Sequence, residues 1–338
     1  MPPFVSVVVR SYNRLGSLCD LIDRLLRQRG PSFEIVVVEQ STHVSDVDAA
    51  RLAAVAADRR VRLIRRPPLG GAGARNVGVE HSAGDIFVFI DDDDLPIGED
   101  FLARHVEAYD DPKCLGVSGR LIFNDDLEHR YSPLLAAVTR TLSYDPILKL
   151  PFTYVQHDHR RIPVYAILGS NASVRRSVWL RFGGWDTDTA IEDEVSFCMR
   201  VLRGKDPDEY FAYDPRPTLL RNRDVAGGLD KRRMPATVYF GHYMDFVHRI
   251  LGRYHATRFV LLYPLYLIAA YVMSVGWIFQ NSRRYRTWPG RIVTALILLV
   301  TLPFFAVRSL VRPGKGFTMP ALPAPAPAAE ADAPPKAS

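Results

Sequence analysis

Four short apolar runs alternate with helical segments between residues 4 and 90, and this alternation constrains the fold more than any other feature. Such runs are typical of buried strands, and repeated strand–helix units imply a parallel sheet covered by helices. We therefore predict an α/β fold with a Rossmann-like first half. The expected strands and helices lie at 4–9, 15–27, 34–39, 47–57, 61–64, 70–79 and 86–90.

Four consecutive aspartates, Asp91 to Asp94, follow the last of these runs. In α/β folds, ligands bind at the carboxyl ends of strands, so the run concentrates negative charge at the binding edge. Neighbouring carboxylates raise one another's pKa unless a cation relieves the repulsion. A divalent metal that holds a phosphorylated substrate is one explanation, because Mg²⁺ binds carboxylates together with phosphate oxygens. The alternative is a solvated acidic turn in which Asp94 or a neighbour caps the next helix.

From about residue 120 to 230 the pattern of strands and helices is less regular. We expect this half of the fold to bind a second substrate. We expect strands at 117–123 and 165–174, and helices at 176–182 and 195–203. Segment 134–150 is either a helix or a loop. The last of these helices begins after three acidic residues, Glu192 to Glu194. Carboxylates at a helix N-terminus also interact favourably with the helix dipole, so this acidic start has a purely structural explanation as well.

The last third of the chain consists of apolar and aromatic segments. Residues 231–258 predict an amphipathic juxtamembrane helix, and 259–279 is an uncharged stretch long enough to cross a bilayer. With a second, shorter stretch at 292–307, segment 259–312 is expected to hold two transmembrane or membrane-embedded helices. Residues 313–338, rich in proline and alanine, are expected to be disordered.

The formal net charge is +6, and much of the excess lies beside these apolar segments. This position favours an anionic membrane surface over nucleic acid as the partner. Arginines flank both apolar stretches and fill the loop between them, so a hairpin and a pair of interfacial helices both remain open. The three distant cysteines, Cys19, Cys114 and Cys198, match neither a disulfide framework nor a zinc site, and we expect reduced cytosolic thiols.

Several motifs occur in a characteristic order along residues 4 to about 225. They are Ser6–Arg14, Val36–Ser41, Gly73–Gly78, the strand into Asp91–Asp94, Gly169–Ser173, and Gly183–Asp186 followed by Glu192-Asp193. Together they resemble a family 2 glycosyltransferase of the membrane-attached bacterial or archaeal type, with the GT-A nucleotide-diphospho-sugar transferase fold. The resemblance implies a glycosyltransferase domain at 1–230, followed by the C-terminal membrane helices.

The resemblance also implies the roles of individual residues. Asp93 corresponds to the direct metal ligand, with Asp91 near the metal or the ribose, and the cofactor would be Mg²⁺ or Mn²⁺. Asp193 corresponds to the catalytic base of an inverting transfer. The residues implied in donor binding are Ser11, Tyr12, Arg14, Glu39, Arg75, Asp91 and Asp92.

Some of these roles have a physical basis of their own. Tyr12, directly after a strand, can lie against a nucleotide base, and Arg75, after a glycine-rich turn, can pair with phosphate. Without the other motifs, a simple strand–helix turn is the better explanation of Ser11–Arg14, and a surface arginine explains Arg75 equally well. Glu39 can accept a hydrogen bond from a uracil-like N–H, but the family usually has aspartate there, so UDP- and GDP-linked donors both stay open. Some members of the family have a histidine after the base that helps to bind the metal or the diphosphate. This chain has no histidine there, and we expect Arg221 or Arg223 to hold phosphate instead.

We therefore expect a metal-dependent, inverting glycosyltransferase at the cell membrane, with its catalytic domain in the cytoplasm. Its donor would be a nucleotide sugar. Its acceptor would be a hydroxyl group of a lipid-linked sugar or glycan, or a lipid phosphate, in the assembly of cell-surface polysaccharide, glycolipid or glycoprotein glycan. Membrane lipid is an expected partner and nucleic acid is not. A nucleotidyltransferase of related fold and a non-catalytic membrane scaffold are the alternatives.

Overall fold

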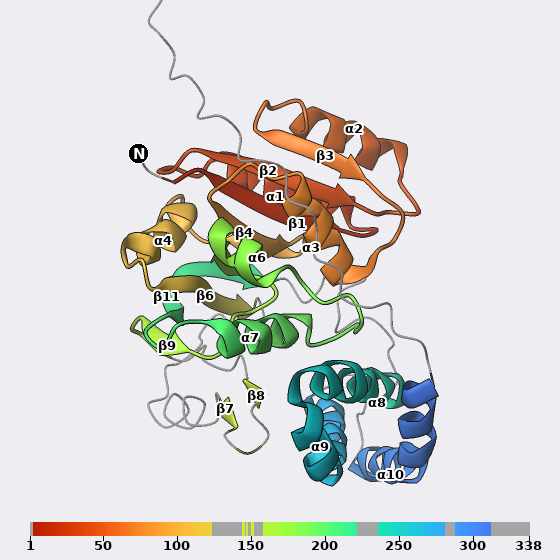
Figure 1. Ribbon diagram of the computed structural model, residues 1–338. Coiled ribbons are helices and arrows are strands. Elements are labelled where there is room, and N and C mark those ends of the chain that lie inside the picture. Colours follow the sequence, from red (N-terminus) through yellow and green to blue (C-terminus); the bar gives the residue numbers. More distant parts are fainter. Residues whose placement is uncertain are drawn as a thin grey trace, which may run out of the picture.

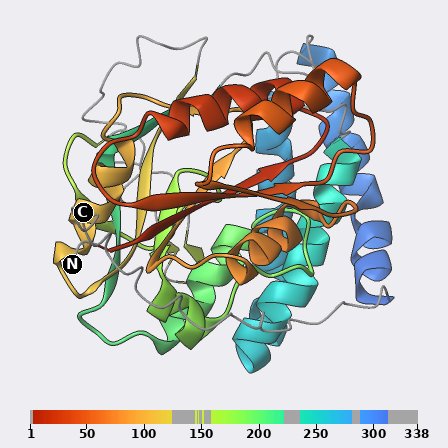
Figure 2. The same cartoon turned by 90° about the horizontal axis from the view of Figure 1, so that it is seen from above.

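The computed structural model describes residues 3–123, 144–145, 147, 150–151, 158–221, 236–280 and 288–311. Within these residues, a nine-stranded mixed sheet carries helices on both faces (Figures 1 and 2). The predicted α/β fold is therefore confirmed. The strands of this sheet are β1 (Val5–Ser11), β2 (Phe33–Glu39), β3 (Val61–Arg65), β4 (Ile86–Asp91), β5 (Asp94–Pro96), β6 (Cys114–Phe123), β9 (Ile162–Val164), β10 (Ala172–Arg175) and β11 (Tyr210–Arg221).

Two further short strands, β7 (Tyr144–Asp145) and β8 (Leu150–Pro151), pair with each other apart from this sheet. Between residues 15 and 204, the described helices are α1 (Leu15–Leu26), α2 (Asp46–Val55), α3 (Gly70–Glu80), α4 (Phe101–Glu107), the 3₁₀ turn η1 (Ala108–Asp110), α6 (Arg176–Phe182) and α7 (Asp193–Gly204). The C-terminal part comprises α8 (Ala236–Asp245), the π-helix η2 (Phe246–Leu251), α9 (Gly252–Gln280) and α10 (Trp288–Val311).

The sheet has a parallel half and a mixed half. Strands β3, β2, β1 and β4 lie side by side in that order and run parallel. Parallel neighbours need crossover connections, which α1, α2 and α3 supply. Beyond β4 follow β10, β6, β11 and β5, with β10 antiparallel to both of its neighbours. The Rossmann-like first half is thus present, and the second half adds strands of both directions.

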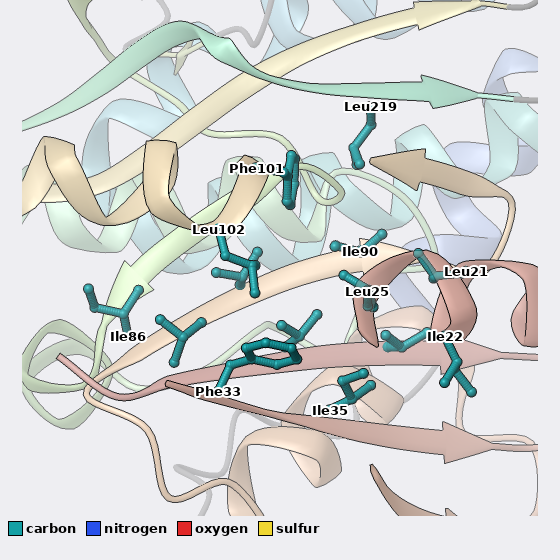
Figure 3. Packing of buried hydrophobic residues seen from close by; sticks show 14 of the residues in the cluster. Leu21, Ile22, Leu25, Phe33, Ile35, Ile86, Ile90, Phe101, Leu102 and Leu219 are labelled. Carbon is teal, nitrogen blue, oxygen red and sulfur yellow. The ribbon is translucent and has the colours of Figure 1, made fainter. Parts of the chain in front are cut away.

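The core lies on both faces of the sheet because successive strand residues point to opposite sides. In β4, Val88 and Ile90 join a cluster with α1 and α4, whereas Phe87 and Phe89 join a second cluster with α6 and α7. Each fully buried aliphatic or aromatic side chain contributes roughly 1.5–3 kcal/mol to folding. Figure 3 shows the first cluster, with Leu21, Ile22, Leu25, Phe33, Ile35, Phe101, Leu102 and Leu219 around β4.

A glycine sets the distance between α3 and the sheet. A Cβ atom at Gly78 would overlap Cγ1 of Val8 on β1, so only glycine allows the helix to lie this close. Arg75 lies about one turn earlier on the same helix. The close packing of α3 therefore determines where the Arg75 side chain meets the carboxyl ends of the strands.

One predicted strand is shorter in the structure. The strand expected at 165–174 is limited to β10, which starts only at Ala172. Asn171, directly before it, has φ 58°, a left-handed conformation that a strand cannot continue through. Most of segment 134–150, together with 231–235 and 313–338, lies outside the described residues.

The C-terminal helices pack together beside α7 (Figure 1). Helices α8, η2 and α9 follow one another directly, so the predicted juxtamembrane helix and the apolar segment from residue 259 belong to one helical run. Among the described residues, α10 is the one helix long and apolar enough to span a membrane, with a mean hydropathy of 2.1. It contains the predicted segment 292–307. In α9 the apolar segment is shorter, Arg258–Val272, and a second span at 259–279 stays a prediction.

Candidate active site

The carboxyl ends of β1, β2 and β4 lie next to one another and begin the site. In the strand register, Ser11 is paired with Glu39, and Arg10 with Asp91. The loops after β1 and β2 are tied together by Asn13, which has φ 54°. Its side-chain oxygen accepts a hydrogen bond of 2.9 Å from the backbone N–H of Thr42. The fold thus brings the predicted donor-binding residues after β1 and β2 to one edge.

The four aspartates divide into two sets according to their contacts. Carboxylate oxygens of Asp91, Asp93 and Asp94 lie within 4.8 Å of one another. The buried Asp92 instead accepts a hydrogen bond of 3.3 Å from the backbone N–H of Tyr12 and pairs with Arg14. The predicted metal ligands Asp91 and Asp93 therefore come together. Asp94, the possible helix cap of the alternative explanation, is instead buried in β5 and joins them.

Arginines on β1, α3 and β11, and one at the start of α1, surround the aspartates. Arg10 on β1 donates to both oxygens of Asp91, at 2.7 and 2.8 Å. Arg14, at the start of α1, reaches Asp93 at 2.6 Å and also contacts Asp92. These bidentate and shared contacts are charge-assisted hydrogen bonds, which fix the carboxylates in position.

Arg221 approaches from the opposite side, at the end of β11. It pairs with Asp94 at 2.7 Å and lies 3.4 Å from Asp91. The hydroxyl of Ser170 donates to Asp94 at 2.5 Å and accepts from the backbone N–H of Asp91 at 3.1 Å. Arg223, the other candidate at this place, lies outside the described residues.

Arg75 connects the aspartates to the predicted base. It is 5% exposed and donates one hydrogen bond of 3.1 Å to Asp91 and another of 3.0 Å to Asp193. Its guanidinium also lies 5.6 Å from the ring centre of Trp185, within the range of a cation–π contact. Arg75 is therefore a buried bridge between the two halves of the site rather than a surface arginine.

Asp193 is the first residue of α7, and the residue before it has an unusual backbone. Glu192 has φ 59°, in the left-handed region, and its carboxylate accepts a hydrogen bond of 3.0 Å from Tyr243 on α8. Burial and the neighbouring Asp193 raise the pKa of Glu192, and burial with both acidic neighbours raises that of Glu194 well above its ordinary value. The predicted acidic cluster is therefore present, and it receives a side chain from the C-terminal helices.

The loop that leads to Asp193 is held by the same helices. Asp186 is fully buried and accepts hydrogen bonds from Ser196 at 2.7 Å and from Arg253 on α9 at 3.0 Å. Arg253 also contacts the buried Asp188, and Arg249 donates to the backbone carbonyl of Asp188 at 3.0 Å. The C-terminal helices thus fix both ends of the segment between Asp186 and Asp193.

The pKa shifts reflect the balance of burial and arginine charge. Burial raises the pKa of Asp91, but Arg10, Arg75 and Arg221 outweigh it, so this pKa lies well below its ordinary value. For Asp92, burial prevails over the charge of Arg14 and raises the pKa to about 6. Asp91 is therefore ionised throughout the physiological range, as a metal ligand must be.

The other predicted residues lie along the same edge. Glu39 is buried at the end of β2, and its carboxylate accepts from the backbone N–H of Ser41 at 2.5 Å. Tyr12 is 39% exposed, which leaves its ring accessible to a base. Sequence reasoning did not assign Arg10 to the site. The parallel pairing of β1 with β4, which places Arg10 opposite Asp91, was the signal that could have identified it.

Comparison with known proteins shows the family of this chain. The model of the glycosyl transferase family 2 matches residues 6–180. An uncharacterized glycosyltransferase of Bacillus subtilis, YwdF, is 24% identical over 201 residues, which cover 59% of this chain and 68% of YwdF. The amylovoran biosynthesis glycosyltransferase AmsB of Erwinia amylovora is 33% identical over 95 residues, which cover 26% of this chain. The match spans only 30% of the length of AmsB.

A solved structure supports the fold. The mannosyltransferase PcManGT from Pyrobaculum calidifontis, determined with GDP-Man and Mn²⁺, superimposes with a TM-score of 0.53 and 20% sequence identity. The match covers 92% of this chain and 88% of that one. It shows the GT-A fold for this chain. Because the family model spans more than half of its length, the chain belongs to glycosyl transferase family 2.

Proposed function

We propose that this glycosyltransferase moves a sugar, with inversion, from a UDP- or GDP-linked donor to a lipid-linked or glycan acceptor. The observation that supports this most directly is the shared guanidinium of Arg75, which joins Asp91 to Asp193. Asp91 ends a strand of the nucleotide-binding half, and Asp193 begins a helix of the acceptor half. The carboxylate proposed for the metal and the one proposed for the acceptor therefore contact the same arginine.

Asp91, Asp93 and Asp94 would hold the divalent cation. Their oxygen atoms are close enough for one ion, and hard oxygen donors suit Mg²⁺ and Mn²⁺ alike. When bound, the cation would offset negative charge on the departing nucleoside diphosphate. Arg10 and Arg221 lie on either side of these aspartates and would contact the diphosphate oxygens.

Asp193 would take the proton from the acceptor hydroxyl. In an inverting transfer, the base acts on the side of the sugar opposite the leaving diphosphate. Arg75 keeps the Asp193 carboxylate oriented into the site by its 3.0 Å hydrogen bond. Tyr12 and Glu39 would contact the nucleotide base, and the longer side chain of glutamate leaves uracil and guanine both open.

The acceptor and the location follow from the C-terminal helices. Helix α10 has the length and hydropathy of a membrane span, and it packs in one cluster with α8, α9 and the start of α7. This packing would hold the active site near a membrane surface, where a lipid-linked acceptor is presented. We propose that the catalytic domain faces the cytoplasm, which supplies the nucleotide sugars.

Two substitutions separate the roles of metal and base. We expect Asp93→Asn to weaken Mn²⁺-dependent stabilisation by UDP or GDP in a thermal-shift titration at least about tenfold. Asp193→Asn should keep that stabilisation and lower the release of nucleoside diphosphate from donor sugars, with membrane lipid extract as acceptor, by roughly 10²–10⁴-fold. The exposed Asp206→Asn serves as the control for both. Full transfer by Asp193→Asn would exclude it as the base, and activity that is unchanged by EDTA would exclude the metal role.

A further inference from the structure

A pocket of about 350 Å³ lies between the second half of α7 and the start of α9. Met199 and Arg203 line it from α7, and His255 and Arg258 line it from α9. An α-helix rises about 1.5 Å per residue, so Arg203 lies roughly 15 Å along α7 from Asp193. The pocket is therefore separate from the proposed catalytic centre, although the same helix contributes to both.

The pocket carries positive charge that its described surroundings do not balance. Arg203 and Arg258 are both exposed, and neither forms an ion pair with a described acidic residue. Burial, followed by the charges of these two arginines, lowers the pKa of His255 to about 4. His255 is therefore neutral at pH 7, and the positive potential of the pocket comes from the two guanidinium groups.

An apolar stripe on α9 starts at this pocket. After Arg258, the exposed side chains Leu261, Leu265, Ile268 and Val272 follow at the spacing that puts helical residues on one face. The stripe begins within one helical turn of the arginine. A ligand that fits both features has an anionic end of headgroup size and a long apolar part.

We propose that the pocket binds the headgroup of an anionic membrane phospholipid, whose acyl chains lie along the stripe on α9. Arginine guanidinium groups form paired hydrogen bonds with phosphate oxygens, which suits a phosphodiester between Arg203 and Arg258. Acyl chains would cover the exposed leucine and isoleucine side chains. Basic pockets beside membrane helices select anionic lipids in this way. The inference rests on the proposed membrane attachment and not on the identity of the donor or acceptor.

The test uses the full chain in neutral detergent and three probes: dihexanoyl phosphatidylglycerol, dihexanoyl phosphatidylcholine and inorganic phosphate. The unfolding midpoint is measured against probe concentration to give an apparent affinity. We expect phosphatidylglycerol to bind at least about tenfold more tightly than the other two. In the double variant Arg203→Gln/Arg258→Gln, this affinity should fall roughly 10- to 30-fold, since each arginine near an anionic lipid contributes on the order of 1 kcal/mol.

The control is Arg24→Gln/Arg27→Gln, which removes the same charge from exposed positions on or just after α1. It should leave the affinity for phosphatidylglycerol unchanged. Equal binding of the two lipids, equal binding of inorganic phosphate, or an equal loss in the control variant would each overturn the proposal. Mn²⁺-dependent nucleotide binding, measured on the same samples, reports that the double variant is folded. If the unmodified chain transfers no sugar but still prefers phosphatidylglycerol, the proposed function fails and the lipid site stands.

Discussion

Tyr243 on α8 donates a hydrogen bond of 3.0 Å to Glu192, the left-handed residue directly before Asp193. A non-glycine residue in this conformation costs free energy and persists only when its surroundings hold it. The surroundings here include a helix of the C-terminal part. The proposed base is therefore positioned partly by the C-terminal helices.

Removing this hydroxyl should slow catalysis without weakening donor binding. A single hydrogen bond contributes about 1 kcal/mol, so we expect Tyr243→Phe to lower kcat roughly fivefold and to leave the KM for the donor unchanged. Tyr271→Phe removes a hydroxyl that bonds to Ala295 within the same helices and should have little effect. Equal kinetics of both variants would show that Tyr243 does not position the base.

Replacing Arg253 should affect the stability of the fold more than replacing Tyr243. It contacts Asp186 and Asp188, which are both buried, and its loss would leave two buried carboxylates with fewer partners. Because Arg253 itself is partly exposed, we expect Arg253→Ala to cost about 2 kcal/mol, less than for a fully buried pair. Urea unfolding followed by tryptophan fluorescence measures the change. Arg29→Ala, which breaks a surface pair with Glu99, should cost under about 0.5 kcal/mol. Similar costs for the two variants would contradict this account.

A buried histidine should make the fold sensitive to acid. Burial lowers the pKa of His105 to about 4, and its ring contacts Ser173 at 3.0 Å and Asn171 at 3.1 Å. The unfolded chain, with a histidine pKa of about 6.5, binds more protons between these values, so stability is present above pH 6.5 and is lost as the pH falls toward 4.

Between pH 7 and pH 4.5, this group should remove about 2.5 kcal/mol of unfolding free energy. Urea titrations at the two pH values measure the loss. It should disappear in His105→Gln and persist in His43→Gln, whose histidine is exposed. The same pH dependence in both variants would assign the acid sensitivity to other groups.

Two glycine-to-alanine changes should have opposite effects on stability, one where α3 lies close to β1 and one in α1. In Gly78→Ala the new methyl group would overlap Val8, at a cost of roughly 1–3 kcal/mol and with a displacement of Arg75. In Gly16→Ala, near the start of α1, the nearest atom is 4.0 Å away, and reduced chain entropy should stabilise the protein by about 0.5 kcal/mol. Thermal unfolding of both variants checks the two signs, and destabilisation of both would contradict the steric explanation.

The sequence predicted the parallel half of the fold well, because its strands are short apolar runs separated by helices with one apolar face. It predicted the start of β10 wrongly. The strand begins only after Asn171, and the left-handed backbone of that residue cannot be recognised from the pattern of apolar residues. Within the site, motifs identified Asp91, Asp93 and Asp193 as candidates. The roles of Arg10 and Tyr243 depend on strand register and helix packing, which bring together residues far apart in the chain.

The ion pairs around β4 carry a consequence for ligand entry. Four aspartates face four arginines, Arg10, Arg14, Arg75 and Arg221, so the two kinds of charge nearly cancel. A divalent cation alone would leave this group too positive, and a nucleoside diphosphate alone would leave it too negative. Entry of the two as a single, nearly neutral complex disturbs the balance least. We therefore expect cation and nucleotide to bind with mutual dependence, each increasing the affinity for the other.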